Sequence, residues 1–107
     1  MNKKFLSLLG LCMKAGKLKS GEFQTEDSIK SGEAWLVIVA EDASNNTKKK
    51  FKDSCTFYEV DYVEMGTKEE LAHAIGKEER SSIAVCDEGF SRSFLKLIRD
   101  LRKAMED

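Results

Sequence analysis

The sequence contains no proline, so none of its helices or strands is interrupted by a residue that lacks a backbone N–H. It also has no apolar run near the roughly 20 residues that a membrane-spanning helix needs. Residues 5–13, an apolar stretch near the N-terminus, are broken by Ser7 and Gly10 and have no small-residue cleavage site of a secretory signal. We therefore expect a cytoplasmic protein with no membrane partner. Its 107 residues suffice for a single domain spanning residues 1–107.

Side chains suited to catalysis or metal binding are equally scarce. The three cysteines lie far apart in apolar surroundings, a pattern that fits neither a disulfide scaffold nor a zinc site, so we expect Cys12, Cys55 and Cys86 to be buried and reduced. His73 is the only histidine, and no Ser or Cys stands at nucleophile spacing from it. We expect it to be a surface or partly packed residue. The sequence indicates no catalytic residue, no metal and no cofactor, and hence no enzyme.

The longest apolar run, residues 35–40, is typical of a central strand that is covered on both faces. Trp35 begins the run, and we therefore place it in the core rather than on a surface where it could stack on a base. The run stops at Glu41 and Asp42, and polar residues suited to a helix start follow, beginning with Ser44. In α/β proteins such an edge usually carries the functional site.

Helix and strand patterns alternate on both sides of this strand. The first helix buries Phe5, Leu8, Leu9 and Cys12, with Leu6, Leu11 and Met13 widening its apolar face. The expected order is helix 5–15, edge strand 17–20, helix 22–31, strand 35–40, helix 47–54, strand 56–63, a helix that starts at a Thr67–Glu70 capping box and stops at Gly76, strand 82–86 and helix 89–105. This alternation predicts an α/β fold with helices on both faces of one sheet of about four strands.

The charges are unevenly distributed, although the formal net charge is only -1. Lysines dominate before the first acid, Glu22, and again around residues 48–52, whereas acids concentrate in residues 59–79. We expect a surface with a basic region and an acidic region. The exposed face of the last helix is also predicted to be basic, with Arg92, Lys96, Arg99, Arg102 and Lys103.

Several ordered segments resemble the ribosomal protein family that includes the archaeal and eukaryotic L-seven-Ae and L-thirty-e proteins, and within it the small bacterial members of the YlxQ type. The segments are Leu9-Gly10-Leu11 with Ala15-Gly16-Lys17, Ser20-Gly21-Glu22, Ala40-Glu41-Asp42-Ala43-Ser44 with Asn46-Thr47-Lys48-Lys49, Glu70-Leu71 with Ile75-Gly76-Lys77, and Val85 with Asp87-Glu88-Gly89-Phe90. Each motif alone is common. Together they cover nearly the whole chain in one order.

The resemblance implies a three-layer αβα sandwich with a mixed sheet that binds structured RNA, typically a kink-turn, and has ribosomal RNA or the ribosome as candidate partners, rather than DNA. In this family the start of the second helix enters the RNA groove and the loop before the last strand covers an extruded base. These elements correspond to residues 21–27 and 76–82. The chain departs from the strongest kink-turn binders at Phe23, Gln24 and Asp27 in the helix, and its loop reads Lys77-Glu78-Glu79-Arg80 instead of an apolar sequence.

The expected RNA-binding residues combine phosphate-binding cations with the two family elements. They are Lys17, Lys19, Ser20, Gly21, Glu22, Phe23, Gln24, Asn46, Lys48, Lys49, Gly76, Lys77 and Arg80. Two alternatives remain open. One is a protein–protein interaction module that has kept the fold and lost the RNA site. The other is a receiver-like site in which Glu41, Asp42 and Asp87 hold a divalent cation.

Overall fold

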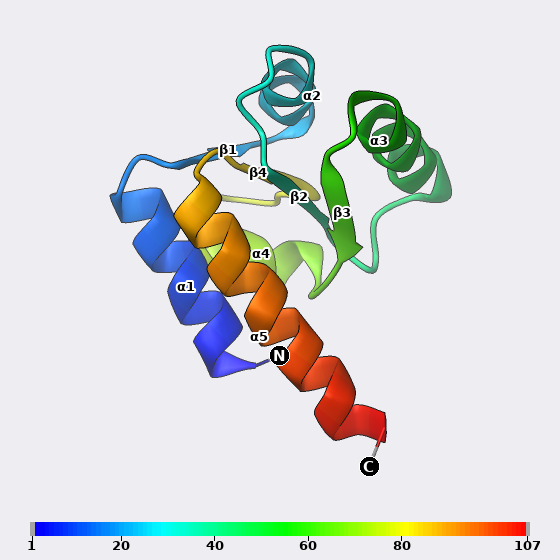
Figure 1. Ribbon diagram of the computed structural model, residues 1–107. Helices are drawn as coiled ribbons and strands as arrows, with labels where there is room; N and C mark the ends of the chain where they lie inside the picture. The colour runs from blue at the N-terminus through cyan, green and yellow to red at the C-terminus, as the bar shows by residue number, and fades with distance from the viewer. Residues whose placement is uncertain (1, 107) are drawn as a thin grey trace.

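A computed structural model describes residues 2–106 and contains five helices and four strands in the predicted alternation (Figure 1). In chain order the elements are α1 (Lys3–Lys14), β1 (Leu18–Ser20), α2 (Glu22–Lys30), β2 (Leu36–Val39), α3 (Asn45–Tyr58), β3 (Asp61–Glu64), α4 (Lys68–Ala74), β4 (Ser82–Val85) and α5 (Glu88–Glu106). The capping box predicted at the start of α4 is present, because the Thr67 hydroxyl accepts from the N–H of Glu70 and the Glu70 carboxylate accepts from the N–H of Thr67.

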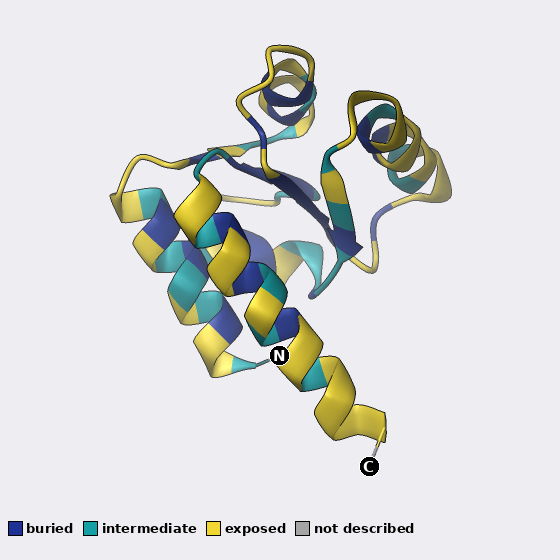
Figure 2. Ribbon diagram, viewed as in Figure 1, coloured by how far each residue is buried: buried dark blue, intermediate teal, exposed yellow. Residues whose placement is uncertain are grey.

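The four strands form one mixed sheet in the order β1-β4-β2-β3. β2 and β3 are parallel, whereas β4 is antiparallel to both of its neighbours, β1 and β2. Helices α2 and α3 cover one face of the sheet, and α1, α4 and α5 cover the other (Figure 1). Every residue of the two central strands is consequently buried (Figure 2). The predicted three-layer αβα sandwich with a mixed sheet of four strands is confirmed.

The layer formed by α1 and α5 is held together by aromatic packing. The rings of Phe5 and Phe94 meet edge to face with their centroids 5.4 Å apart. Leu9 and Cys12 complete the fully buried stripe of α1. Our prediction that Leu11 widens this stripe is wrong, because its side chain is 57% exposed. Leu11 stands two positions after Leu9, which places it about 200° around the helix from the buried side.

The helix after β2 is longer than the sequence indicated. We predicted a helix over residues 47–54 and a strand over 56–63, but α3 continues to Tyr58 and β3 is confined to Asp61–Glu64. Phe51 and Cys55, four residues apart, bury one face of α3 against the sheet and keep the segment helical. The aromatic residues Phe57 and Tyr58 therefore project from a helix end into solvent instead of packing in a strand.

Trp35 also differs from its prediction as a core residue, since its side chain is 49% exposed. Its backbone N–H donates to the carbonyl oxygen of Val85 (2.8 Å) just before β2 begins. Leu36, the first residue of β2, is fully buried, whereas the exposed indole belongs to the residue just before the strand begins.

The thiols behave largely as expected, and all three are free. Cys12 and Cys55 are buried, and burial raises the pKa of each thiol to about 12. Cys86 is only partly buried. His73 is exposed on α4, in agreement with its prediction as a surface residue. None of the helices within residues 2–106 combines the length and the apolar composition needed to cross a membrane.

Candidate nucleic-acid interface

The antiparallel direction of β4 gathers most of the predicted segments at one edge of the sheet. Because β1 and β2 both run opposite to β4, they run parallel to each other, and the ends of β1, β2 and β3 meet beside the start of β4. Helix α2 follows β1 and α3 follows β2, so both helices start at this edge. We call it the helix-start edge, comprising residues 20–24, 41–49 and 76–82. The opposite edge, where α2 and α3 end, is the helix-end edge.

The start of α2 has backbone donors that the protein itself leaves open. Gly21 adopts φ 94° and ψ 159°, a conformation that only glycine adopts readily, and its N–H donates to the Ser82 carbonyl oxygen (3.0 Å). The first-turn N–H groups of α2, like those of any helix, have no intrahelical acceptor, and here no side chain caps them either. Among the described residues, the other four helix starts are capped by side chains, those of Asn2, Ser44, Thr67 and Asp87.

Arg80 fixes the loop before β4 against the start of α2. Its Nε donates to the Ser20 hydroxyl (3.1 Å), and its Nη1 donates to the carbonyl oxygens of Glu78 (2.7 Å) and Glu79 (3.0 Å). The guanidinium thus joins residues that are 60 positions apart in the chain. Two segments that the sequence predicted to act together are in contact, and one fork-shaped side chain connects them.

Lys50 neutralises the acids on the adjoining side of α2. Its Nζ lies 2.9 Å from Glu22 Oε1 and 2.6 Å from Glu26 Oε2, and Lys30 lies 2.7 Å from the other oxygen of Glu26. Hydrogen bonds from Lys30 and Lys50 lower the pKa of the Glu26 carboxyl. Lys50 was not among the predicted RNA-binding residues. It belongs to the same lysine run as Lys48 and Lys49, but only the structure shows which of the three faces α2.

The other lysines of that run have different surroundings. Lys48 is partly buried, and its Nζ lies 3.7 Å from Glu64 Oε1. The Tyr62 hydroxyl donates to the same carboxylate (2.8 Å). By contrast, Lys49 and Asn46 are exposed on the first turns of α3. Asn46 is neutral, and Lys49 forms no ion pair among the described residues. Both can therefore reach a ligand at the helix-start edge without first breaking an ion pair.

The remaining predicted residues fall into two groups. Lys19, Phe23, Gln24, Gly76 and Lys77 are exposed at or next to the helix-start edge, and Phe23 is 82% exposed. Lys17 precedes β1 and accepts at its carbonyl oxygen from the N–H of Cys86 (2.8 Å), which follows β4. The strand β1 lies between Lys17 and Gly21, and four residues of extended chain separate them by about 13 Å. The structure does not bring Lys17 to the helix-start edge.

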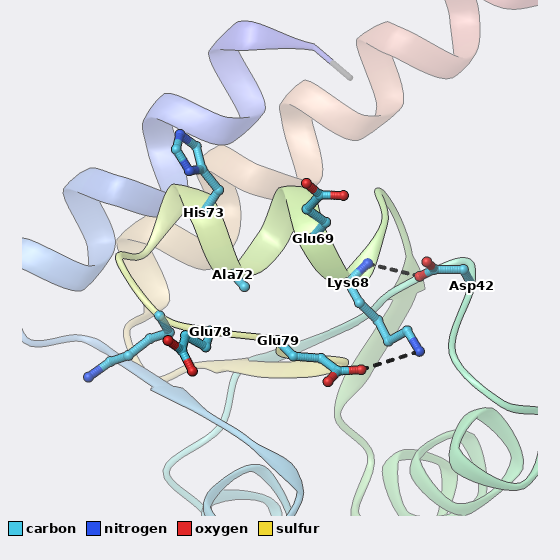
Figure 3. A pocket seen from close by; sticks show the side chains of 8 residues that line it. Asp42, Lys68, Glu69, Ala72, His73, Glu78 and Glu79 are labelled. Carbon is cyan, nitrogen blue, oxygen red and sulfur yellow. Dashed lines mark hydrogen bonds and ion pairs between the residues drawn. The ribbon is translucent and has the colours of Figure 1, made fainter.

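Beside the loop lies an open cleft of about 470 Å³ that sequence reasoning missed (Figure 3). The Lys68 N–H donates to Asp42 Oδ1 (2.8 Å), and the Lys68 Nζ lies 3.6 Å from Glu79 Oε1. These contacts join α4, the end of β2 and the loop. The cleft is lined by Asp42, Lys68, Glu69, Ala72, His73, Lys77, Glu78 and Glu79. The sequence had pointed to Asp42 and to the loop residues Lys77, Glu78 and Glu79, but no pattern joined them to α4.

The structure contradicts the receiver-like cation site. Asp87 follows the antiparallel strand β4 and therefore lies at the helix-end edge, away from Glu41 and Asp42. There its carboxylate accepts from the N–H of Phe90 (2.9 Å) and caps α5. Within residues 2–106 no three His, Cys, Asp or Glu side chains are grouped in a way that could hold a metal ion.

Comparison with known proteins agrees with this fold. The sequence of residues 3–95 matches the family model described as the ribosomal protein L7Ae/L30e/S12e/Gadd45 family. The chain belongs to this family. It is 42% identical over 91 residues to the RNA-binding protein YlxQ of Bacillus subtilis, covering 85% of this chain and 91% of the relative. It is 43% identical over 96 residues to the RNA-binding protein YlxQ of Enterococcus faecium, covering 90% and 92%.

Solved structures give the same result for the L7Ae fold. A protein of unknown function from Bacillus halodurans superposes with a TM-score of 0.87 at 43% identity, over 92% of this chain and 99% of that one. A 15.5 kD RNA-binding protein from Giardia lamblia superposes with a TM-score of 0.76 over 94% of this chain and 92% of that one. At 20% identity, the second likeness concerns the fold alone.

Proposed function

We propose that this protein is a non-catalytic RNA-binding protein that binds structured RNA through the helix-start edge. The observation that carries the proposal is the contact between the uncapped start of α2 and the loop docked by Arg80. The names of the two YlxQ relatives, both described as RNA-binding, support it. Family membership favours ribosomal RNA, or another structured RNA of the translation apparatus, as the partner.

The proposed binding mode begins with phosphate. The three N–H groups at the start of α2, together with the helix dipole, favour an anion at this point. Lys19, Lys49 and Lys77 add exposed positive charge at or next to the same edge. Backbone contacts of this kind supply much of the affinity of a protein for nucleic acid and make it dependent on salt.

Base contacts would come from α2 itself. The exposed ring of Phe23 offers a stacking surface for an unpaired base, and the exposed amide of Gln24 can donate and accept at a base edge. Both sit in the first turn, beside the phosphate position. A kink-turn presents phosphates and unpaired bases close together, so we propose it as the RNA shape that this edge recognises.

A salt series on two RNA hairpins tests the function. One hairpin contains a standard kink-turn and the other is a plain duplex of equal length. We expect tighter binding to the kink-turn, with affinity falling as salt rises. Equal binding to both hairpins would remove the kink-turn assignment, and absence of binding to either at low salt would remove the function.

Charge reversal tests the site. Lys19→Glu and Lys77→Glu should each weaken RNA binding and reduce the salt slope by about 1, without lowering stability, because both side chains are exposed and unpaired among the described residues. Lys96→Glu, on the exposed face of α5, is the matched control. Wild-type affinity in both edge variants, or an equal loss in the control, would contradict the assignment of the site.

One observation favours a second candidate, a protein-binding module. Asp27, Glu78 and Glu79 are exposed acids on or beside the same structural elements, and they repel phosphate. If the edge binds a protein, the charge-reversal variants should leave binding intact, while Glu78→Lys should weaken it. In the RNA model Glu78→Lys should strengthen binding, so this single variant distinguishes the two candidates.

A further inference from the structure

The helix-end edge carries a groove of about 380 Å³ that no part of the proposed RNA function uses. Among its lining residues Ile29 and Ala34 are buried and Val60 is partly buried, so apolar side chains form part of its wall. The full lining comprises Ile29, Lys30, Gly32, Ala34, Trp35, Tyr58, Glu59, Val60 and Asp61. These residues come from the end of α2, the approach to β2, the end of α3 and the approach to β3.

Three exposed aromatic side chains mark this edge. Trp35 and Tyr58 both line the groove, and both are more than 40% exposed. Phe57 is 78% exposed, and its ring meets that of Tyr58 edge to face with centroids 4.9 Å apart. Tryptophan and tyrosine with this much open ring surface are characteristic of binding sites, since they bring large contact area at low entropic cost.

The charge at the groove is negative. Of its three charged lining residues, Lys30 is neutralised by Glu26 at 2.7 Å. Glu59 and Asp61 remain, both exposed and neither in an ion pair within residues 2–106. Two open carboxylates beside aromatic rings repel a phosphate backbone and attract a cation, so RNA is not the favoured occupant.

Glu59 occupies a backbone position that suits glycine better. It ends α3 in the left-handed conformation, with φ 58° and ψ 45°, where a helix most often has glycine. A side chain at this position carries a conformational cost that glycine would avoid. The residue in this place nevertheless supplies a carboxylate at the mouth of the groove, and no hydrogen bond or ion pair within residues 2–106 gives that carboxylate a role in the fold.

We propose that the groove is a docking site for a basic segment of a partner protein, with an arginine side chain held between the aromatic rings and the two carboxylates. The guanidinium stacks on the rings of Trp35 and Tyr58, and Glu59 and Asp61 accept its hydrogen bonds. The site lies at the opposite end of the sheet from the proposed RNA interface. One molecule of this protein can therefore hold RNA and a basic protein segment at the same time.

The test uses the full chain without RNA and a short synthetic peptide in which arginine alternates with glycine. Trp35 is the only tryptophan, so its emission reports on the groove directly. We expect saturable binding that shifts this emission. The same peptide with citrulline, which keeps the shape and removes the charge, should bind much more weakly. Equal binding of the two peptides, or no change in emission, would overturn the proposal.

Two variants, measured by calorimetry, locate the site. Trp35→Ala should lower the affinity about tenfold. Glu59→Gly should lower it about two- to fivefold, with an unfolding midpoint that is unchanged or higher, because glycine fits the left-handed backbone. Leu11→Ala, at an exposed apolar residue of α1, is the control and should bind as wild type.

The second variant keeps the test decisive if the first does not fold. Wild-type affinity in Glu59→Gly would overturn the proposal, as would a shift of Trp35 emission by an oligouridine that competes with the peptide. RNA binding to the kink-turn hairpin should be unchanged in both variants. The two sites can therefore fail independently, and loss of the proposed RNA function would leave this inference intact.

Discussion

Replacing Arg80 with lysine separates two roles that the loop before β4 could give this side chain. The guanidinium could hold the loop against α2, or it could simply add positive charge to the helix-start edge. Lysine keeps the charge but cannot reproduce three donors in a rigid fork, which here reach the Ser20 hydroxyl and the carbonyl oxygens of Glu78 and Glu79. We expect Arg80→Lys to bind RNA more weakly although its charge is unchanged.

The magnitude follows from the hydrogen bonds. A hydrogen bond from a charged donor is worth about 1.5–3 kcal/mol when it is buried, but Arg80 is partly exposed, so the contact with Ser20 should contribute about 1 kcal/mol. If binding requires the docked loop, the free energy lost from docking appears in the affinity, as a decrease of about fivefold. The salt slope should stay as in wild type, because the number of cations is the same.

A double-mutant cycle with Ser20→Ala provides the assay. Urea unfolding and RNA binding are measured for wild type, Arg80→Lys, Ser20→Ala and the double variant. We expect a coupling free energy of about 0.5–1 kcal/mol in both measurements, because either substitution alone already breaks the same contact. Additive effects in unfolding, or wild-type RNA affinity in Arg80→Lys, would refute the idea that the guanidinium positions the loop.

Three further results are expected. Thr67→Ala should lower the free energy of unfolding by about 1 kcal/mol, measured by urea denaturation, because it removes the acceptor of the α4 capping box; no loss would mean that the cap contributes nothing. Glu26→Gln should be less stable than wild type at pH 7, because it removes the ion pairs with Lys30 and Lys50. The difference should vanish as pH falls through the depressed pKa of the Glu26 carboxyl, below its ordinary value of 4.5, because protonation ends the same ion pairs. A stability difference that persists in acid would contradict this pH dependence. A thiol reagent at pH 8 should react first with Cys86, which is only partly buried. The buried thiols of Cys12 and Cys55, whose pKa burial raises to about 12, should react only after unfolding, and mass spectrometry should show this order.

The sequence predicted every element whose burial has a clear period. The stripe of Phe5, Leu9 and Cys12 is confirmed because its spacing matches the helical repeat, and the strand β2 is confirmed because its apolar run is short and β-branched. Residues 56–58 were assigned wrongly because they contain two aromatic residues, which favour strands when they can pack on a neighbouring strand. In the structure no strand lies beside them, and the spacing of Phe51 and Cys55 determines a helix.

The site was harder to predict because it depends on which residues end up opposite each other. The loop at residues 76–82 and the start of α2 could be named from the family pattern, but the hydrogen bond from Arg80 to Ser20 could not. The same holds for the lysine run. Periodicity places Lys48, Lys49 and Lys50 on one helix, but only the packing of α3 against α2 and β3 decides that Lys50 pairs with α2, Lys48 with β3, and Lys49 with neither.

The direction of a single strand explains much of this outcome. Because β4 enters the sheet antiparallel, the loop before it arrives at the edge where α2 and α3 begin, and the residues after it leave at the opposite edge. A parallel β4 would have brought Asp87 next to Glu41 and Asp42 and removed Arg80 from Ser20. It would have exchanged the Arg80 guanidinium beside open helix amides for a cluster of carboxylates. Whether the helix-start edge offers open helix amides with a docked guanidinium or a cluster of carboxylates is therefore decided by topology as much as by composition.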